Sequence, residues 1–226
     1  MPWSLWDAVA IWAFAYVAGG TLIMSLSGAV AEVATLPLSV VAVGATTVAY
    51  VGVRYGGTGL RQLMGDRRAG LRDVVAGTLH GAVAFAVFNL GLLSLVNLVV
   101  LRVQGEVPQV QEGIRQAADS ALPLVFLSSA AILAPIGEEL FFRGVVMTRL
   151  RDRFGRVSAI LLSSVIFTVV HYEVGNPQGS LMSFIGLFPL AIYLAIVFDR
   201  RRNLVAVMTM HASFNALGVA GILATL

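Results

Sequence analysis

The chain has 226 residues, of which 58% are hydrophobic and only 12% are charged, and its mean hydropathy is +0.87. This apolar share is well above that of an ordinary soluble domain, so the composition predicts a membrane protein with several spans. The net charge of +3 is too small for nucleic-acid binding, and the absence of cysteine excludes a disulfide framework, a thiolate metal site and a cysteine nucleophile.

Seven apolar segments follow one another along the chain, and most are long enough for a helix to cross a hydrocarbon core of about 30 Å. They cover approximately residues 5–26, 36–55, 73–101, 121–149, 157–171, 181–198 and 204–226. With about 20 residues per span, the remaining length leaves no room for a separate soluble domain. The pattern therefore predicts an all-α, polytopic membrane protein that forms a single transmembrane domain over residues 1–226, with about seven transmembrane helices.

The first segment begins among Trp3, Trp6 and Trp12, a residue type enriched at membrane interfaces. The small residues at 29–31 resemble the cleavage site of a signal peptide. However, no basic residue precedes Arg54, and the apolar stretch is longer than that of a signal peptide. We therefore expect this segment to remain in place as the first membrane helix.

All fifteen basic residues are arginines, and most of them lie in three of the connections. Twelve of the fifteen arginines lie in residues 54–72, 149–156 and 200–202. The connections expected on the opposite side lie near Glu32, over residues 102–120 and near Glu173. Because short cytoplasmic loops are enriched in basic residues, this alternation predicts a cytoplasmic N-terminus.

Six polar side chains stand out in or at the ends of the predicted spans. They are Glu138, Glu139, Arg143, His171, His211 and Asn215. A charged side chain at the centre of a bilayer costs about 2.5 to 3.5 kcal/mol, so three such residues in one span point to a function. Three further polar residues, His80, Asn89 and Asn97, are interpreted as polar groups of helix packing.

Helical spacing separates the roles of the two adjacent carboxylates. Glu139 and Arg143 are four residues apart in the favourable order for an ion pair, whereas Glu138 points about 100° away and is free to face a pocket. His211 and Asn215, also four residues apart, share one face of their helix. Counted from the basic connections at about 1.5 Å per residue, Glu138, His171 and His211 lie at similar depths, so we expect them to meet.

This set of side chains predicts a hydrolytic site. A carboxylate beside an imidazole can take a proton from water, and His211 with Asn215 can donate hydrogen bonds to the oxyanion formed when that water attacks a peptide carbonyl. We prefer this metal-independent mechanism, which needs no cofactor. A divalent metal such as zinc remains an alternative, since Glu138, His171, His211 and Asn215 offer two nitrogen and two oxygen ligands.

Three motifs on separate spans resemble those of the CPBP superfamily, which includes type II CAAX prenyl endopeptidases and bacterial abortive-infection proteases. The motifs are Glu138-Glu139-x-x-x-Arg143, Phe167-x-x-x-His171 and His211-x-x-x-Asn215. The resemblance implies a protease core at about residues 121–226, in which Glu138 and His171 activate water and His211 and Asn215 stabilise the transition state. It assigns Glu139 and Arg143 a supporting role.

Composition and net charge predict the bilayer and exclude nucleic acid as partners, and the resemblance implies the substrate. We expect contact with the lipid bilayer, a peptide or membrane-protein substrate such as a lipidated C-terminal tail or a leader peptide, and no nucleic acid. The expected location is a bacterial cytoplasmic membrane, crossed several times. Motifs of other membrane proteases are absent from the sequence, including His-Glu-x-x-His for zinc enzymes and Gly-x-Gly-Asp for aspartyl enzymes.

Two functions from other classes compete with proteolysis. The same pocket would serve a membrane immunity or scaffold protein that binds a partner without catalysis. Separate Glu138→Ala and His211→Ala variants distinguish the two, because they abolish the phenotype of a protease and leave that of a scaffold. A proton-coupled transporter also uses buried Glu and His, but the chain shows neither an inverted repeat nor paired broken helices.

Overall fold

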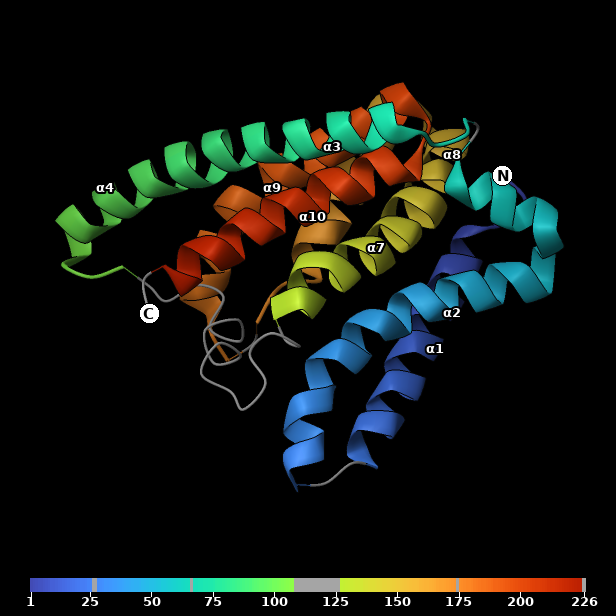
Figure 1. Ribbon diagram of the computed structural model, residues 1–226, viewed down its shortest axis with the longest axis horizontal. Helices are drawn as coiled ribbons and strands as arrows, with labels where there is room; N and C mark the ends of the chain where they lie inside the picture. Colours follow the sequence, from blue (N-terminus) through green and yellow to red (C-terminus); the bar gives the residue numbers. More distant parts are fainter. Residues whose placement is uncertain (26–27, 66, 108–126, 174, 225–226) are drawn as a thin grey trace.

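The computed structural model describes residues 1–25, 28–65, 67–107, 127–173 and 175–224, with backbone only at residues 28–37, 39 and 40. Helices account for every regular element in these ranges, so the all-α prediction is confirmed (Figure 1). In chain order they are α1 (Leu5–Met24), α2 (Gly28–Met64), α3 (Leu71–Ala84), η1 (Phe85–Leu93), α4 (Ser94–Gln104), η2 (Ser129–Leu133), α7 (Ala134–Glu139), η3 (Leu140–Met147), α8 (Thr148–Val169), α9 (Pro177–Arg201) and α10 (Leu204–Leu223). The elements labelled η are π-helical.

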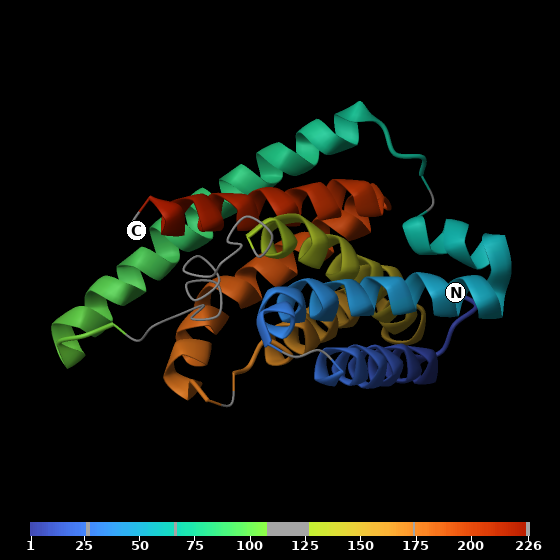
Figure 2. The same cartoon turned by 60° about the horizontal axis from the view of Figure 1, so that its bottom comes forward.

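Four helical stretches within the described residues are long and apolar enough to cross a membrane. They are Leu5–Met24, Leu71–Gln104, Pro177–Arg201 and Leu204–Leu223. The second of these joins α3, η1 and α4 into one continuous rod, which runs above α9 and α10 in Figure 1 and crosses α10 at an angle in Figure 2. The count of seven spans and the cytoplasmic side of the N-terminus stay predictions.

The basic connections expected at residues 54–72 and 149–156 are largely helical. The first is shorter than expected, with irregular backbone at residues 65 and 67–70 between α2 and α3, and the second is a corner within α8. In residues 54–72, α2 continues to Met64 and leaves helical geometry only at Gly56, with φ 63° and ψ −163°. In residues 149–156, α8 runs on through the arginines and breaks only at Gly155, with φ 80° and ψ 178°. This backbone region is open essentially to glycine alone, which explains how one residue turns the chain. Of the expected loop at 102–120, residues 108–120 lie outside the described residues.

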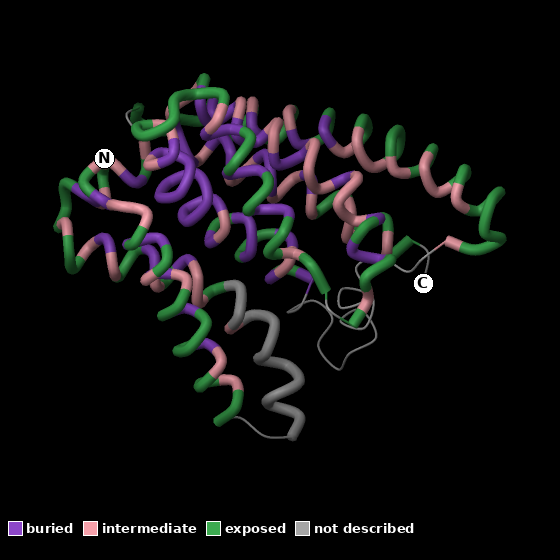
Figure 3. Tube along the Cα trace, turned by 180° about the vertical axis from the view of Figure 1, so that it is seen from behind, coloured by how far each residue is buried: buried purple, intermediate pink, exposed green. Residues whose placement is uncertain are grey.

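The buried part of the molecule is centred on η3 and its neighbours. All eight residues of η3 are buried, and Figure 3 shows buried backbone gathered there while the α4 end is largely exposed. Trp12 of α1 packs its ring 5.3 Å from that of Phe141 and 6.1 Å from that of Phe142. The helix that carries the Glu-Glu motif is therefore covered on several sides by other helices.

The glycine pair Gly77 and Gly81 lets α3 approach α10 closely. A Cβ atom at Gly81 would lie 2.7 Å from the Ser213 Cβ, and one at Gly77 would meet the Ala206 carbonyl and the Thr209 hydroxyl. This is the close packing that small residues four apart permit. Gly52 and Gly56 have the same spacing but make no such close contact, because a Cβ at Gly52 would meet only the Leu60 side chain at 3.6 Å or more and one at Gly56 would meet no atom within 4 Å.

We expect Gly77→Leu to lower the stability of the protein by about 1 to 3 kcal/mol, since the added atoms force the backbones of α3 and α10 apart. Thermal unfolding of the detergent-solubilised protein measures the effect. Gly221→Leu is the matched control, because a Cβ at Gly221 has no neighbour within 4 Å. Equal melting temperatures for the two variants would contradict this account of the α3–α10 contact.

Candidate active site

The ion pair predicted within the Glu-Glu motif is present and sealed from the surroundings. Arg143 Nη1 lies 2.9 Å from Glu139 Oε1, and neither side chain has any exposed surface. The pair joins the end of α7 to the first turn of η3. Arg143 also donates from Nη2 to the Ala191 carbonyl of α9 at 3.1 Å and lies over the Phe167 ring, 4.6 Å from its centroid.

Glu139 has a second partner that sequence reasoning missed. Its Oε1 also accepts a hydrogen bond from His211 Nδ1 of α10 at 2.9 Å. One buried carboxylate oxygen therefore holds an arginine from its own helix and a histidine 72 residues away. Helical spacing carries no signal for this contact, because it depends on how α10 is rotated relative to α7.

Glu138 lies between the two histidines, as the sequence predicted. Its Oε1 is 3.8 Å from His171 Nε2, and its Oε2 is 3.8 Å from His211 Nε2. The exposed fraction of the side chain is 22% for Glu138 and 31% for His171, whereas it is 3% for His211. Glu138 and His171 are therefore partly exposed, whereas His211 is buried.

Hydrogen bonds on the far side of each imidazole orient the ring. His171 Nδ1 donates to the Phe167 carbonyl at 2.7 Å, and His211 Nδ1 donates to Glu139. Both Nε2 atoms are thus left to face Glu138. Since a neutral ring with its proton on Nδ1 carries a lone pair on Nε2, each Nε2 can accept a proton, and it can donate one once the ring carries both protons.

Asn215 lies one turn beyond His211 and ties α10 to η2. Its side-chain Nδ2 donates to the Ala130 carbonyl at 3.0 Å. This bond uses one of its two N–H donors. Ala130 lies on the helical stretch that leads into the Glu-Glu motif, so the bond fixes the position of the asparagine relative to the carboxylates.

Aromatic rings and a close backbone contact form the walls of the site. The Phe167 ring is fully buried and lies 5.0 Å from the ring of Phe142, 4.7 Å from that of His171 and 5.7 Å from that of His211. Phe167 therefore packs against both histidines. On the α2 side, a Cβ at Gly44 would lie 2.8 Å from the Cα of Gly137, so the backbones of α2 and α7 are in contact.

The three other polar residues of the predicted spans lie apart from these groups. His80 Nδ1 shares a hydrogen bond with the Tyr193 hydroxyl, which links α3 to α9. The Asn89 carbonyl accepts from the Ser94 hydroxyl within the same rod. The Asn97 Oδ1 is buried and has no hydrogen-bond partner among the described residues.

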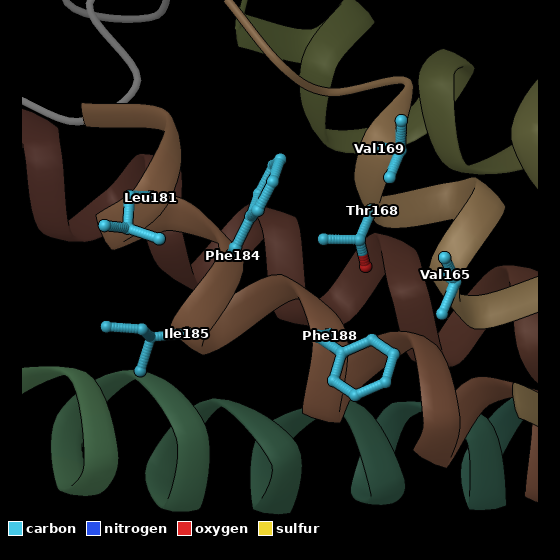
Figure 4. Close-up of a pocket in the computed structure, with 7 residues that line it drawn as sticks. All are labelled: Val165, Thr168, Val169, Leu181, Phe184, Ile185 and Phe188. Atoms are coloured by element: carbon cyan, nitrogen blue, oxygen red, sulfur yellow. The ribbon is translucent and has the colours of Figure 1, made fainter. Parts of the chain in front are cut away.

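An apolar cavity of about 350 Å³ opens between α8 and α9 (Figure 4). Its lining residues are Val165, Thr168, Val169, Leu181, Phe184, Ile185 and Phe188. The single hydroxyl among them, on Thr168, donates to the Ser164 carbonyl of its own helix. The cavity contains none of the six predicted site residues and offers no acid or base.

The comparisons with known proteins identify one family. Residues 120–217 match the family model described as type II CAAX prenyl endopeptidase Rce1-like. No curated protein and no solved structure matches the chain. The match includes all three sequence motifs, confirms the resemblance to the CPBP superfamily and supports a protease-type function in a membrane.

Proposed function

Taking residues 120–217 as an Rce1-like domain of the CPBP superfamily, we propose that this integral membrane protein is an intramembrane endopeptidase of the glutamate type. The observation that carries the proposal is the position of Glu138, 3.8 Å from the Nε2 atoms of both His171 and His211. A gap of this size is longer than a direct hydrogen bond and suits groups that share a water molecule or a substrate oxygen.

In the proposed reaction, Glu138 and His171 act on the attacking water. The water oxygen bonds to the peptide carbonyl carbon while its proton passes to the Glu138 carboxylate, with His171 Nε2 holding the water in line. The carbonyl oxygen becomes an oxyanion, to which His211 Nε2 donates when its ring carries both protons. The free N–H of the Asn215 amide is the second proposed donor.

Collapse of the tetrahedral intermediate completes the reaction. The carbon–nitrogen bond breaks, Glu138 returns its proton to the leaving nitrogen, and the products are a carboxylic acid and an amine. Glu139 and Arg143 do not touch the peptide in this scheme. They support it, because Glu139 orients His211 and Arg143 anchors Glu139.

A metal-dependent version would use the same four side chains, Glu138, His171, His211 and Asn215. Two ligands at about 2.05 Å in a tetrahedral site are roughly 3.3 Å apart, so each 3.8 Å separation would have to shorten by about 0.5 Å. Among the described residues, no three His, Asp or Glu side chains are already gathered around one point. A bound zinc would polarise the peptide carbonyl and activate water.

We expect hydrolysis to survive removal of divalent metals. The detergent-purified protein is incubated with a quenched fluorescent peptide library, with and without a strong chelator, and the rate of fluorescence increase is measured. Equal rates support the metal-independent mechanism. A rate that falls with chelator and recovers on addition of zinc would instead establish the metal-dependent version.

The proposed substrates are peptides presented at a membrane, namely lipidated C-terminal tails, leader peptides or the ends of membrane proteins. The proposed location is a bacterial cytoplasmic membrane, with the cleaved bond near its cytoplasmic face. Peptides with and without a C-terminal prenyl group, included in the same assay, separate the first substrate class from the others.

A further inference from the structure

The corner at Gly155 sets the relative orientation of two parts of the proposed active site. The helical stretch before it, from Ser129 to Phe154, carries Glu138. The part of α8 after it leads to Phe167 and His171. Glu138 and His171 each lie about 25 Å of helix away from the corner. A change of 5° in the angle between the two helices would move them apart by about 2 Å.

Asp199, near the end of α9, binds both sides of this corner. Its Oδ1 pairs with Nη1 of Arg151, which lies in the last turn before Gly155. Its Oδ2 lies 2.6 Å from Nε of Arg156, the first residue after Gly155. One carboxylate thus bridges the two helices across the single residue at which the chain turns.

The surroundings of Asp199 distinguish it from an ordinary surface ion pair. Its side chain is only 5% exposed, whereas those of Arg151 and Arg156 are 35% and 53% exposed. A carboxylate in the last turn of a helix is also disfavoured by the helix dipole. A buried acid in an unfavourable place, neutralised by two arginines from another helix, is consistent with a specific positional role.

The second corner, at Gly56, offers a comparison. Asp7 of α1 is also buried there and accepts hydrogen bonds from the Tyr50 and Tyr55 hydroxyls, with Arg54 Nε 3.1 Å away. All three partners precede Gly56. Asp7 therefore fastens α1 to one arm of α2, whereas Asp199 joins the two arms of its corner.

We propose that Asp199 is a positioning residue, which holds the angle at Gly155 and so maintains the spacing between Glu138 and His171. The far ends of the two helices meet through Phe142 and Phe167, and Asp199 holds the near end. The effect of Asp199 on catalysis rests on the proposed hydrolytic function, whereas its effect on the helix angle is independent of that function. The two effects can be measured separately.

A change in the angle is detected as a change in the distance between two spin labels, measured by pulsed electron–electron double resonance. Because the chain has no cysteine, Ile132→Cys and Val169→Cys provide two unique labelling sites, 51% and 57% exposed, on opposite sides of the corner. With Asp199→Asn in this background, we expect the mean distance to shift by about 2 Å or more, or the distribution to broaden. A distribution identical to that of the parent would overturn the proposal, whatever the activity.

The kinetic test uses the peptide cleaved fastest in the quenched library. We expect Asp199→Asn to lower kcat by about 10- to 100-fold with KM within about twofold, because misplaced catalytic groups slow the chemical step more than binding. Asp199→Glu is expected to restore most of kcat. Asp73→Asn is the matched control, since Asp73 is also a buried acid but pairs with Arg201 and not with Arg151 or Arg156, the two arginines that flank Gly155.

Two further outcomes are distinguishable. If Asp199→Asn does not fold, Arg156→Gln removes one arm of the bridge while leaving Arg151 on Asp199, and a label distribution unchanged in that variant would overturn the proposal. If the parent protein cleaves no peptide but the distribution changes in Asp199→Asn, the positional role holds and the hydrolytic function fails.

Discussion

Replacing Glu138 by glutamine is expected to lower kcat by about 10²- to 10⁴-fold, the usual contribution of a general acid–base residue. Glutamine keeps the size of the side chain but cannot accept the proton of water. The residue is 22% exposed and lies 3.8 Å from each imidazole, beyond hydrogen-bond distance, so the substitution breaks no direct hydrogen bond to either ring. Initial rates on the library peptide, at matched protein concentration, measure the loss.

Glu173→Gln is the control for this experiment. It removes an exposed carboxylate two residues after His171 and leaves the three motifs intact. We expect its rate to equal that of the parent. A Glu138→Gln protein with the parent's rate would exclude Glu138 as the base. If the variant also kept the biological phenotype of the protein, the non-enzymatic scaffold would become the better explanation.

The largest effect on stability is expected from Arg143→Met. Removing the guanidinium leaves the Glu139 charge fully buried without its cationic partner and removes the hydrogen bond to the Ala191 carbonyl. Breaking a buried ion pair by deleting one partner costs about 3 to 5 kcal/mol. In a protein of this length the melting temperature should fall by roughly 10 °C, as measured by thermal unfolding in detergent.

The double variant Glu139→Gln with Arg143→Met gives the matched comparison. Here the buried charge is removed together with its partner, and the glutamine oxygen can still accept from His211 Nδ1. We expect the double variant to be more stable than Arg143→Met alone, because no uncompensated charge remains. A single variant with the parent's melting temperature would show that the pair contributes little to stability.

Local spacing and depth in the membrane predicted the core of the candidate site. Glu139 and Arg143 pair because four residues make one helical turn, and Glu138 faces elsewhere for the same reason. Counting from the arginine clusters placed His171 and His211 within reach of Glu138, and the structure has them both at 3.8 Å. These inferences depend only on the helical repeat.

Other features depend on tertiary packing, and there the sequence was misleading. The glycines and arginines of residues 54–72 predicted a loop from Arg54 onward, but α2 continues to Met64, where Leu63 packs beneath Gly144 of η3, and the irregular backbone begins only at residue 65. Trp3 was expected at the membrane interface. It is only 1% exposed and donates from its indole N–H to the Val145 carbonyl, whereas Trp6 is 81% exposed. Composition indicates where a chain turns, but not what the turning segment will contact.

The shared oxygen of Glu139 has a consequence for how this protein would respond to random mutation. A random-mutagenesis screen that ranks positions by loss of activity would place Glu139 and Arg143 beside Glu138, although neither contacts the peptide in the proposed scheme. Natural variation at these two positions would be restricted to coordinated exchanges, since a change in one leaves the other stranded in an apolar interior. The supporting pair and the proposed catalytic carboxylate would therefore tolerate substitution equally poorly, although only the carboxylate acts on the peptide.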